Sequence, residues 1–248
     1  MKEKEITHRL RIDISMYDQR GCFYISSYQK LVMNMIEEHL DEFGIGQKYL
    51  MENSGISWVL LYNCIELKKP LSPDMKLTAI TWNSEIKAPV FRRDFAIYDE
   101  TNGEEIARGA TLSTLFDHNE RKVCTDREKI RSISLEEGEK ICDIERRFRP
   151  VCEFCKADER IARPSMADGI GHVNNTRYGE FVYDAMSDEE RRKLAFVRRI
   201  DNWFFSELVP GDEFCISRGN TDDDSDAVFF MGSKVEDGKN AFAVKLSF

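Results

Sequence analysis

Residues 27–43 read SYQKLVMNMIEEHLDEF, and this stretch indicates what kind of fold the chain adopts. Its apolar residues recur at steps of three and four, which predicts an amphipathic helix with one buried face. They are Tyr28, Leu31, Val32, Met35, Ile36, Leu40 and Phe43. Gly44 and Gly46 follow directly and predict the end of the helix. The apolar stripe is wide enough that we expect this helix to be buried.

Segments with the composition of β-strands follow the helix. They are rich in β-branched and aromatic residues and are separated by turn-forming Pro, Asn and Gly residues. The predicted strands span residues 56–67, 75–87, 90–99 and 105–117. One helix followed by an antiparallel meander is therefore the predicted organisation of the first half.

The second half repeats this order. A helix is predicted over residues 174–194, and strands are predicted near residues 197–208, 212–219, 226–236 and 240–248. Turn landmarks also repeat, since Leu71–Asp74 matches Leu208–Asp212 and the Asn102-Gly103 turn matches Asp237-Gly238. These matches indicate an internal duplication.

The predicted fold is therefore α+β, with two helices that are each wrapped by a curved antiparallel sheet. This is the tandem, or double, hot-dog fold. We expect an N-terminal hot-dog domain over residues 1–130, a linker over 131–147 and a C-terminal hot-dog domain over 148–248. The segment before residue 147 is strongly charged and lacks strand alternation, which suits a linker containing a short helix.

Composition limits the class of protein. The formal charge of −9 argues against a general nucleic-acid surface, and no apolar run approaches the length of a membrane span. The charged start, Met1–Glu5, lacks the features of a secretory signal. Seven cysteines without a repeating pattern suit reduced thiols, and chance is the preferred interpretation of the Cys152-x-x-Cys155 pair. We expect a cytoplasmic protein.

Polar chemistry is concentrated in the stretch Asp168-Gly-Ile-Gly-His172-Val-Asn-Asn175. It brings a carboxylate, an imidazole and two carboxamides to a predicted loop-to-helix junction. Asn174 or Asn175 can cap the helix, and we expect the first helical N–H groups to be free to polarise a substrate oxygen. The same loop then supplies titratable groups and a positive dipole.

Taken with Trp58, Thr81-Trp82 and Phe95-x-Ile-Tyr-Asp99, this motif gives the chain a clear resemblance. It resembles the acyl-acyl carrier protein (acyl-ACP) thioesterases over nearly its whole length. The resemblance implies that Phe204-Phe-Ser-Glu207 supplies a second carboxylate, with Phe204 in place of the family's Tyr. It departs from the family at Ile170, where relatives carry an Asn.

The resemblance implies a hydrolase that releases free fatty acid from acyl-ACP, ends fatty acid synthesis and needs no cofactor. Its implied catalytic residues are Asp168, His172 and Glu207. We expect Glu207 or His172 to activate water while Asp168 orients the imidazole or the water. The sequence leaves open which carboxylate moves the proton.

Four further residues are predicted to contact substrate. Asn174 and Asn175 flank the catalytic motif, although we expect both mainly to anchor the helix. Trp58 and Trp82 are candidate linings of an acyl tunnel, although core packing explains them equally well. No metal site is predicted, because the acidic run Asp222–Asp224 lacks the alternating ligands of a calcium loop.

Two other functions stay open at this point. One is a hot-dog hydratase or dehydratase acting on acyl thioesters, since the same fold supports both chemistries. The other is a noncatalytic module that binds an acyl chain or acyl carrier protein, which Ile170 motivates. The expected partner is an acyl carrier protein bearing a fatty acyl thioester. A homodimer is possible, but the sequence does not give the oligomeric state.

Overall fold

The elements of the computed structural model are described for residues 6–150, 152–220 and 226–248. The predictions made for Met1–Glu5 and for Asp222–Asp224 concern residues outside these ranges. The described chain divides into two units by its internal contacts. Unit 1 comprises residues 1–12, 31–68 and 73–144, and unit 2 comprises residues 13–30, 69–72 and 145–248.

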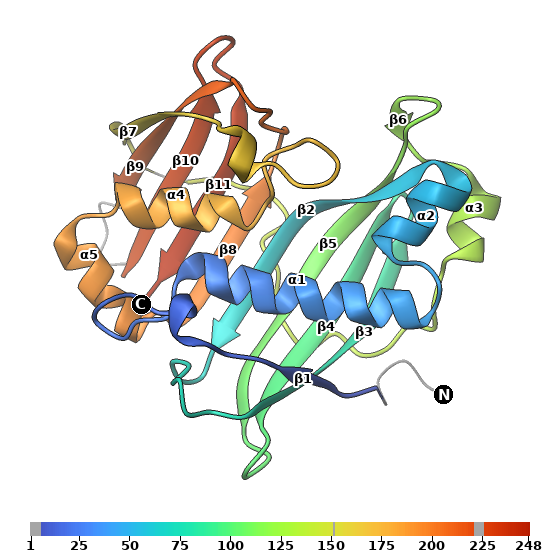
Figure 1. Cartoon of the computed structure of the whole chain (residues 1–248), viewed down its shortest axis with the longest axis horizontal. Coiled ribbons are helices and arrows are strands. Elements are labelled where there is room, and N and C mark those ends of the chain that lie inside the picture. Colours follow the sequence, from blue (N-terminus) through green and yellow to red (C-terminus); the bar gives the residue numbers. More distant parts are fainter. Residues whose placement is uncertain (1–5, 151, 221–225) are drawn as a thin grey trace. The chain divides into compact units, whose positions relative to one another are not determined.

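Unit 1 contains an antiparallel sheet with the strand order β1-β3-β4-β5-β2 (Figure 1). Its strands are β1 (His8–Leu10), β2 (Ile56–Leu67), β3 (Leu77–Lys87), β4 (Val90–Asp99) and β5 (Glu105–Asp117). The short strand β6 (Lys122–Val123) pairs with β5. The unit also contains α2 (Gln47–Ser54), α3 (Arg127–Ser132) and residues 31–42 of helix α1. The four long strands coincide closely with the predicted ones, since period-two patterning and turn residues marked their ends.

Helix α1 (Ile25–Glu42) is the helix that the opening stretch predicts. Its apolar stripe is buried, as expected of a central helix, and includes Leu31, Val32, Met35, Ile36 and Leu40. The helix ends where Gly44 adopts a positive φ of 68°, a conformation that glycine takes without strain. Just beyond it, the indole Nε1 of Trp58 in β2 donates to the carbonyl of Ile45 at 2.9 Å. The chain leaving α1 is thereby fixed to the sheet of unit 1.

Unit 2 contains antiparallel strands in the order β8-β11-β10-β9-β7. Its strands are β7 (Phe154–Ile161), β8 (Arg199–Phe204), β9 (Glu213–Asn220), β10 (Ala227–Lys234) and β11 (Asn240–Ser247). The helices are α4 (Arg177–Ala185) and α5 (Asp188–Lys193), with 3-10 turns η2 (Ile14–Met16), η3 (Pro164–Met166) and η4 (Leu194–Phe196). Both units therefore place a helix against an antiparallel sheet, and the α+β hot-dog prediction is confirmed.

Aromatic side chains hold α4 on its sheet. The ring of Tyr178 stacks on Phe242 of β11 with centroids 4.3 Å apart, and Phe181 lies 5.2 Å from Phe214 of β9. All four side chains are buried. Burial of side chains this large stabilises the helix position by about 1.5–3 kcal/mol each.

One predicted element needs correction, and other elements were not predicted. The helix predicted over residues 174–194 is two helices, because Ser187 caps α5 with a reciprocal bond pair to Glu190 and ends the run. Helix α2 and strand β7 were not predicted. Five of the eight residues of β7 are exposed, so the strand shows no buried alternating face in its sequence.

The charged linker is ordered and bonded to the sheets. In unit 1, Trp82 Nε1 donates to the carbonyl of Glu139 at 2.7 Å, and the Ile141 N–H donates to Asp94 Oδ1 at 2.9 Å. In unit 2, Trp203 Nε1 donates to the carbonyl of Glu145 at 2.8 Å. The linker is therefore held in place by hydrogen bonds of its backbone.

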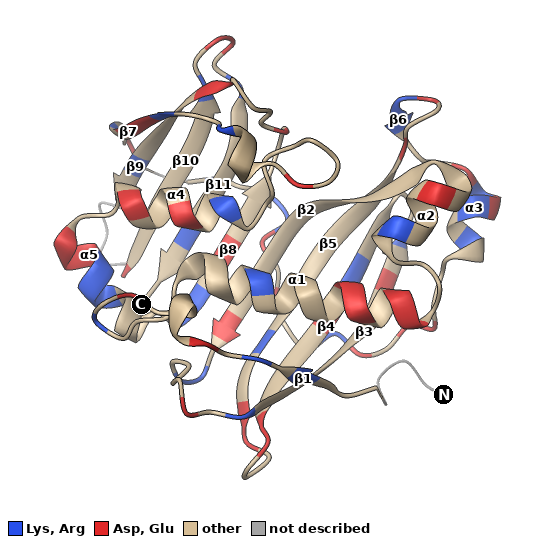
Figure 2. Ribbon diagram, viewed as in Figure 1, with Lys and Arg blue, Asp and Glu red and all other residues tan. Residues whose placement is uncertain are grey.

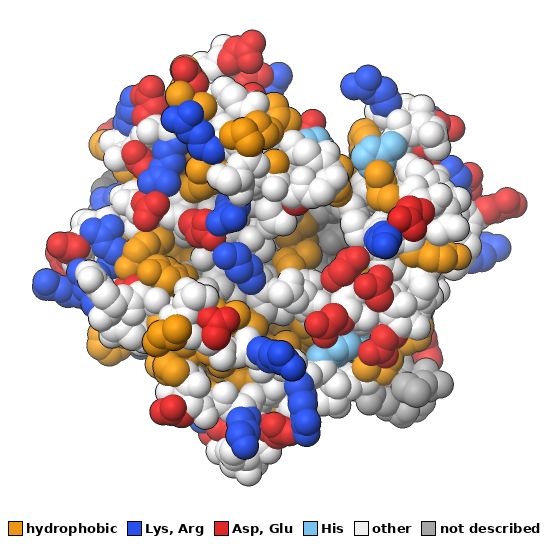
Figure 3. Space-filling view, in the orientation of Figure 1, with side chains coloured by type: hydrophobic (Ala, Val, Ile, Leu, Met, Phe, Trp, Pro, Cys, Tyr) orange, Lys and Arg blue, Asp and Glu red, His pale blue; other side chains and the backbone are white. Residues whose placement is uncertain are grey.

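Charged side chains are distributed unevenly along the helices and strands. In Figure 2 the acidic residues of α1 lie in the C-terminal half of that helix. Acidic and basic side chains are interspersed over the face seen in Figure 3. Among the described residues, no helix combines the length and apolar character that crossing a membrane requires.

Candidate functional site

The loop before α4 is a closed turn of backbone hydrogen bonds. The Asp168 N–H donates to the carbonyl of His172 at 2.9 Å, and the Gly171 N–H donates back to the carbonyl of Asp168 at 3.0 Å. Gly171 has a φ of 90°, which a residue with a side chain rarely adopts. The loop therefore holds His172 at a defined position at the start of the helical segment.

The segment that follows β8 brings Glu207 to this loop. Glu207 follows the end of β8, and the Val173 N–H donates to the carbonyl of Leu208 at 2.7 Å. His172 precedes Val173 and Glu207 precedes Leu208, so this backbone bond places His172 next to Glu207. His172 Nε2 lies 3.1 Å from Glu207 Oε2, with 37% of the His172 side chain and 61% of the Glu207 side chain exposed. The structure thus pairs an imidazole with a carboxylate in contact with solvent.

Asp168 is bonded mainly to its own loop. Its Oδ1 accepts the N–H of Ile170 at 2.9 Å, and the residue is exposed. Among the described residues, no hydrogen bond or ion pair joins its carboxylate to the His172 ring. The Ile170 side chain is 38% exposed. The geometry gives Asp168 a role in shaping the loop, whereas the direct contact of His172 is with Glu207.

The N-cap of α4 is Thr176, whose side chain makes no cap bond to a described residue, so the prediction that Asn174 or Asn175 caps the helix is wrong. Asn174 instead bonds to this N-cap residue. Its Oδ1 accepts the N–H of Thr176 at 3.0 Å and the Thr176 hydroxyl at 2.7 Å. The next N–H groups are also occupied, because Arg177 donates to the carbonyl of Asn174 and Tyr178 to that of Asn175. The expectation of free N–H groups in the first turn of α4 is therefore wrong for these positions. In the described part of the chain, the N–H of Asn175 has no assigned acceptor.

The first half of the chain carries a copy of this loop, 150 residues earlier. The Asp18 N–H donates to the carbonyl of Cys22 at 2.8 Å, and the Gly21 N–H donates to the carbonyl of Asp18 at 2.9 Å. Gly21 also has a positive φ, of 79°. The Asp-x-x-Gly spacing shared with Asp168 and Gly171 is the signal in the sequence that marks this copy.

The two loops differ in their chemistry. Cys22 stands where the second loop has His172, and Pro70 precedes Leu71 where Glu207 precedes Leu208. Asp18 is buried, and its Oδ2 accepts the hydroxyl of Tyr183 at 2.8 Å. Burial and this carboxylate raise the pKa of Tyr183. The first loop therefore has the same backbone hydrogen bonds and serves as a structural element. The imidazole–carboxylate pair is present in the second loop.

The N-terminal domain model of the acyl-ACP thioesterases matches residues 3–133, more than half of the chain. The chain belongs to the acyl-ACP thioesterase family. It is a thioester hydrolase that acts on acyl-ACP, which confirms the predicted activity. No curated protein matches the chain in sequence.

Two solved acyl-ACP thioesterase structures share its architecture. An acyl-ACP thioesterase from Bacteroides thetaiotaomicron is 22% identical, with a TM-score of 0.81 over 100% of both chains. The 12:0-ACP thioesterase from Umbellularia californica is 15% identical, with a TM-score of 0.80 over 98% of this chain and 96% of that one. At these identities the similarity shows a common fold.

The two tryptophans predicted to contact the acyl chain lie in unit 1. Trp58 is half-buried, and its ring meets Phe91 edge-on with centroids 5.0 Å apart. Trp82 is 1% exposed and holds the linker through the bond to Glu139. Of the two, Trp58 is the better placed to present ring surface to a ligand.

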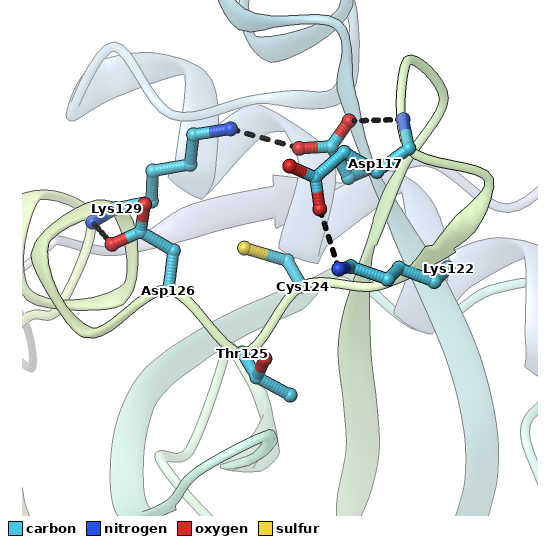
Figure 4. Close-up of a pocket in the computed structure, with 7 residues that line it drawn as sticks. Asp117, Lys122, Cys124, Thr125, Asp126 and Lys129 are labelled. Carbon is cyan, nitrogen blue, oxygen red and sulfur yellow. Dashed lines mark hydrogen bonds and ion pairs between the residues drawn. The ribbon is translucent and has the colours of Figure 1, made fainter.

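A pocket of about 280 Å³ lies between β5, β6 and α3 (Figure 4). Ion pairs line it, including Lys129 Nζ–Asp117 Oδ2 at 2.8 Å and Lys122 Nζ–Glu120 Oε2 at 2.8 Å. Such a lining does not suit the apolar chain of an acyl-ACP. In the described part of the chain, no group of three or more His, Cys, Asp or Glu residues could hold a metal ion.

Proposed function

We propose that the His172–Glu207 pair carries out the hydrolysis, releasing a free fatty acid from its acyl carrier protein and so ending chain elongation in the cytoplasm. The observation that carries this proposal is the 3.1 Å contact between His172 Nε2 and Glu207 Oε2 at an exposed loop. Thioester hydrolysis needs an activated water and a donor for the carbonyl oxygen. Groups for both tasks lie at the head of α4.

His172 is the proposed general base. When its Nε2–H donates to Glu207, Nδ1 carries the lone pair that accepts a proton from water. Among the described residues, no hydrogen bond occupies this Nδ1. The water oxygen attacks the thioester carbon, and the imidazolium that forms faces the Glu207 carboxylate, which stabilises its charge.

The same proton then serves the leaving group. When the carbon–sulfur bond breaks, the His172 Nδ1–H protonates the departing thiolate of the carrier arm. The products are a free acid and a thiol, and the imidazole returns to its neutral form. This sequence requires no cofactor.

The Asn175 N–H is the proposed donor to the developing oxyanion. It stands at the start of α4, where the helix dipole adds positive potential, and no acceptor is assigned to it in the described residues. Asn174 supports this arrangement by holding Thr176. Asp168 keeps the loop in shape, and Trp58 is the proposed contact for the acyl chain.

Ile170 marks where this chain departs from its relatives. Its side chain is exposed at the loop, so it can contact the carrier arm without displacing His172 or Glu207. A thioester hydrolysis site built from His172 and Glu207 does not need the amide that relatives carry at this position.

The test is release of thiol from a panel of acyl-ACPs of increasing chain length. The wild-type protein is expected to turn over, and His172→Ala is expected to lose turnover while retaining its fold by circular dichroism. His118→Ala is the matched control, since His118 lies in unit 1 and bonds to Ser57 at 2.8 Å.

The outcomes also test the two alternatives that the sequence alone left open. Saturable binding of acyl-ACP without thiol release would favour a noncatalytic binding module. Formation of a hydrated or dehydrated acyl thioester without thiol release would favour the hydratase or dehydratase. Full activity in His172→Ala would remove the imidazole from the mechanism.

A further inference from the structure

Two buried thiols meet where the linker passes strand β2. The Sγ atoms of Cys64, in β2, and Cys142, in the linker, lie 3.3 Å apart. Cys64 is 0% exposed and Cys142 is 6% exposed. The two residues are 78 positions apart in the sequence, so no spacing pattern predicts their contact. The Cys152-x-x-Cys155 pair, which the spacing does suggest, is a different one.

Hydrogen bonds on both sides of Cys142 hold the linker in this register. The Ile141 N–H donates to Asp94 Oδ1 at 2.9 Å, and Arg108 Nη1 donates to the carbonyl of Ile141 at 3.2 Å. The carbonyl of Cys142 accepts a hydrogen bond from Arg92 Nη2. The contact between the two sulfur atoms is therefore part of a docked segment.

A charged side chain also lies beside Cys142. Arg92 places a guanidinium beside the linker at Cys142, while Asp94 binds the same guanidinium at 2.7 Å. A neighbouring cation favours the thiolate, which is the form that begins disulfide exchange. The Arg92–Asp94 ion pair thus lies beside the linker backbone at Cys142.

We propose that Cys64 and Cys142 form a modification site, at which a low-molecular-weight disulfide oxidises the two thiols to one disulfide bond. One thiolate attacks the oxidant and forms a mixed disulfide, releasing one small thiol. The second thiolate then displaces the other small thiol and closes the protein disulfide. The two cysteines lose two electrons and two protons, and the oxidant takes them up as two thiols.

The required movement is small. A disulfide needs the sulfur atoms at about 2.05 Å, so they must approach by about 1.3 Å. Cys142 lies outside the helices and strands, and its side chain and local backbone can supply that shift without breaking a strand ladder. The new bond would tie β2 to the linker two residues before unit 1 ends at Ile144.

The experiment is oxidation of the whole protein with oxidised glutathione, followed by alkylation and peptide mapping without reductant. We expect one cross-linked peptide pair containing Cys64 and Cys142. We also expect the unfolding temperature to rise by about 5–10 °C on oxidation, because the bond closes a long loop. Reduction should return it to its original value.

Matched variants identify the sulfur atoms. Cys64→Ser and Cys142→Ser are each expected to abolish the cross-link and the shift in unfolding temperature. Cys124→Ser is the control, since Cys124 is another buried cysteine of unit 1. It is expected to retain both effects. If Cys64→Ser does not fold, Cys142→Ser and the wild-type peptide map decide the matter.

One result would overturn the proposal. The exposed Cys155 reports whether the oxidant has acted, because it is open to glutathione. Glutathionylated Cys155 together with alkylated Cys64 and Cys142 would show that the pair does not form a disulfide. Because this readout involves no acyl substrate, it stands or falls separately from the proposed hydrolysis mechanism.

Discussion

Replacing Glu207 with Gln tests the catalytic pair without removing its shape. Gln keeps the size of the side chain and an oxygen that can accept from His172 Nε2, but it removes the negative charge. At the 3.1 Å separation, that charge stabilises an imidazolium by about 1.3 kcal/mol at water-like dielectric and about 5 kcal/mol at an effective value of 20.

Because Glu207 is exposed to solvent, its stabilisation of the imidazolium lies in the lower part of this range. With 61% of the Glu207 side chain in solvent, about 1.5–3 kcal/mol is expected, which is a fall in kcat of roughly 10- to 150-fold. The free energy of unfolding should change by less than about 1 kcal/mol, because exposed ion pairs contribute little to stability.

The assay is steady-state thiol release from the preferred acyl-ACP, with urea unfolding measured on the same samples. Glu236→Gln, an exposed residue in the turn after β10, is the control and should leave both quantities unchanged. Retention of wild-type kcat in Glu207→Gln, alongside an inactive His172→Ala, would show that the carboxylate does not act through the imidazole.

Three further predictions concern the loop, the linker and acid stability. Ile170→Asn should leave hydrolysis unchanged or raise it, and a large fall in thiol release would show that this loop positions substrate differently from its relatives. Trp203→Phe removes the indole N–H that bonds the linker backbone and should lower the free energy of unfolding by about 2–3 kcal/mol in urea titration. Burial raises the pKa of Glu190, but hydrogen bonds from the Ser187 backbone and Arg218 outweigh it, so the folded pKa lies below the ordinary 4.5. Glu190 therefore stabilises the fold above about pH 4.5, and this contribution is lost as pH falls through its folded pKa. Between pH 7 and pH 3, the unfolding temperature of Glu190→Gln should fall less steeply than that of the wild-type protein. Parallel plots of unfolding temperature against pH would contradict this role for Glu190.

The regular elements were predictable because their apolar residues repeat. Residues 56–67 alternate and are bounded by turn residues, and β2 spans the same positions. By contrast, β7 is an exposed edge strand, so packing places few demands on its side chains. The break between α4 and α5 did have a signal, since Ser187 and Glu190 form a capping box in the sequence.

For the site, the sequence suggested candidate residues but not their contacts. His172 and Glu207 are far apart in the chain, and they meet because Val173 pairs with Leu208. Sequence spacing suggested instead that Asp168 would orient the imidazole, since the two are four residues apart. A backbone bond between distant segments decides which carboxylate lies beside the ring, and local spacing carries no information about such a bond.

The docked linker has a consequence for how this protein can be rearranged. A charged segment between two similar halves looks like a natural place to cut, extend or recombine the chain. Here its backbone accepts indole N–H groups from Trp82 and Trp203, and its Ile141 N–H is bonded to Asp94. Tolerance to insertion depends on the burial and bonding of the backbone involved. Residues 139–145 should therefore resist circular permutation and inserted tags, and the Asn102-Gly103 turn is the more permissive place for both.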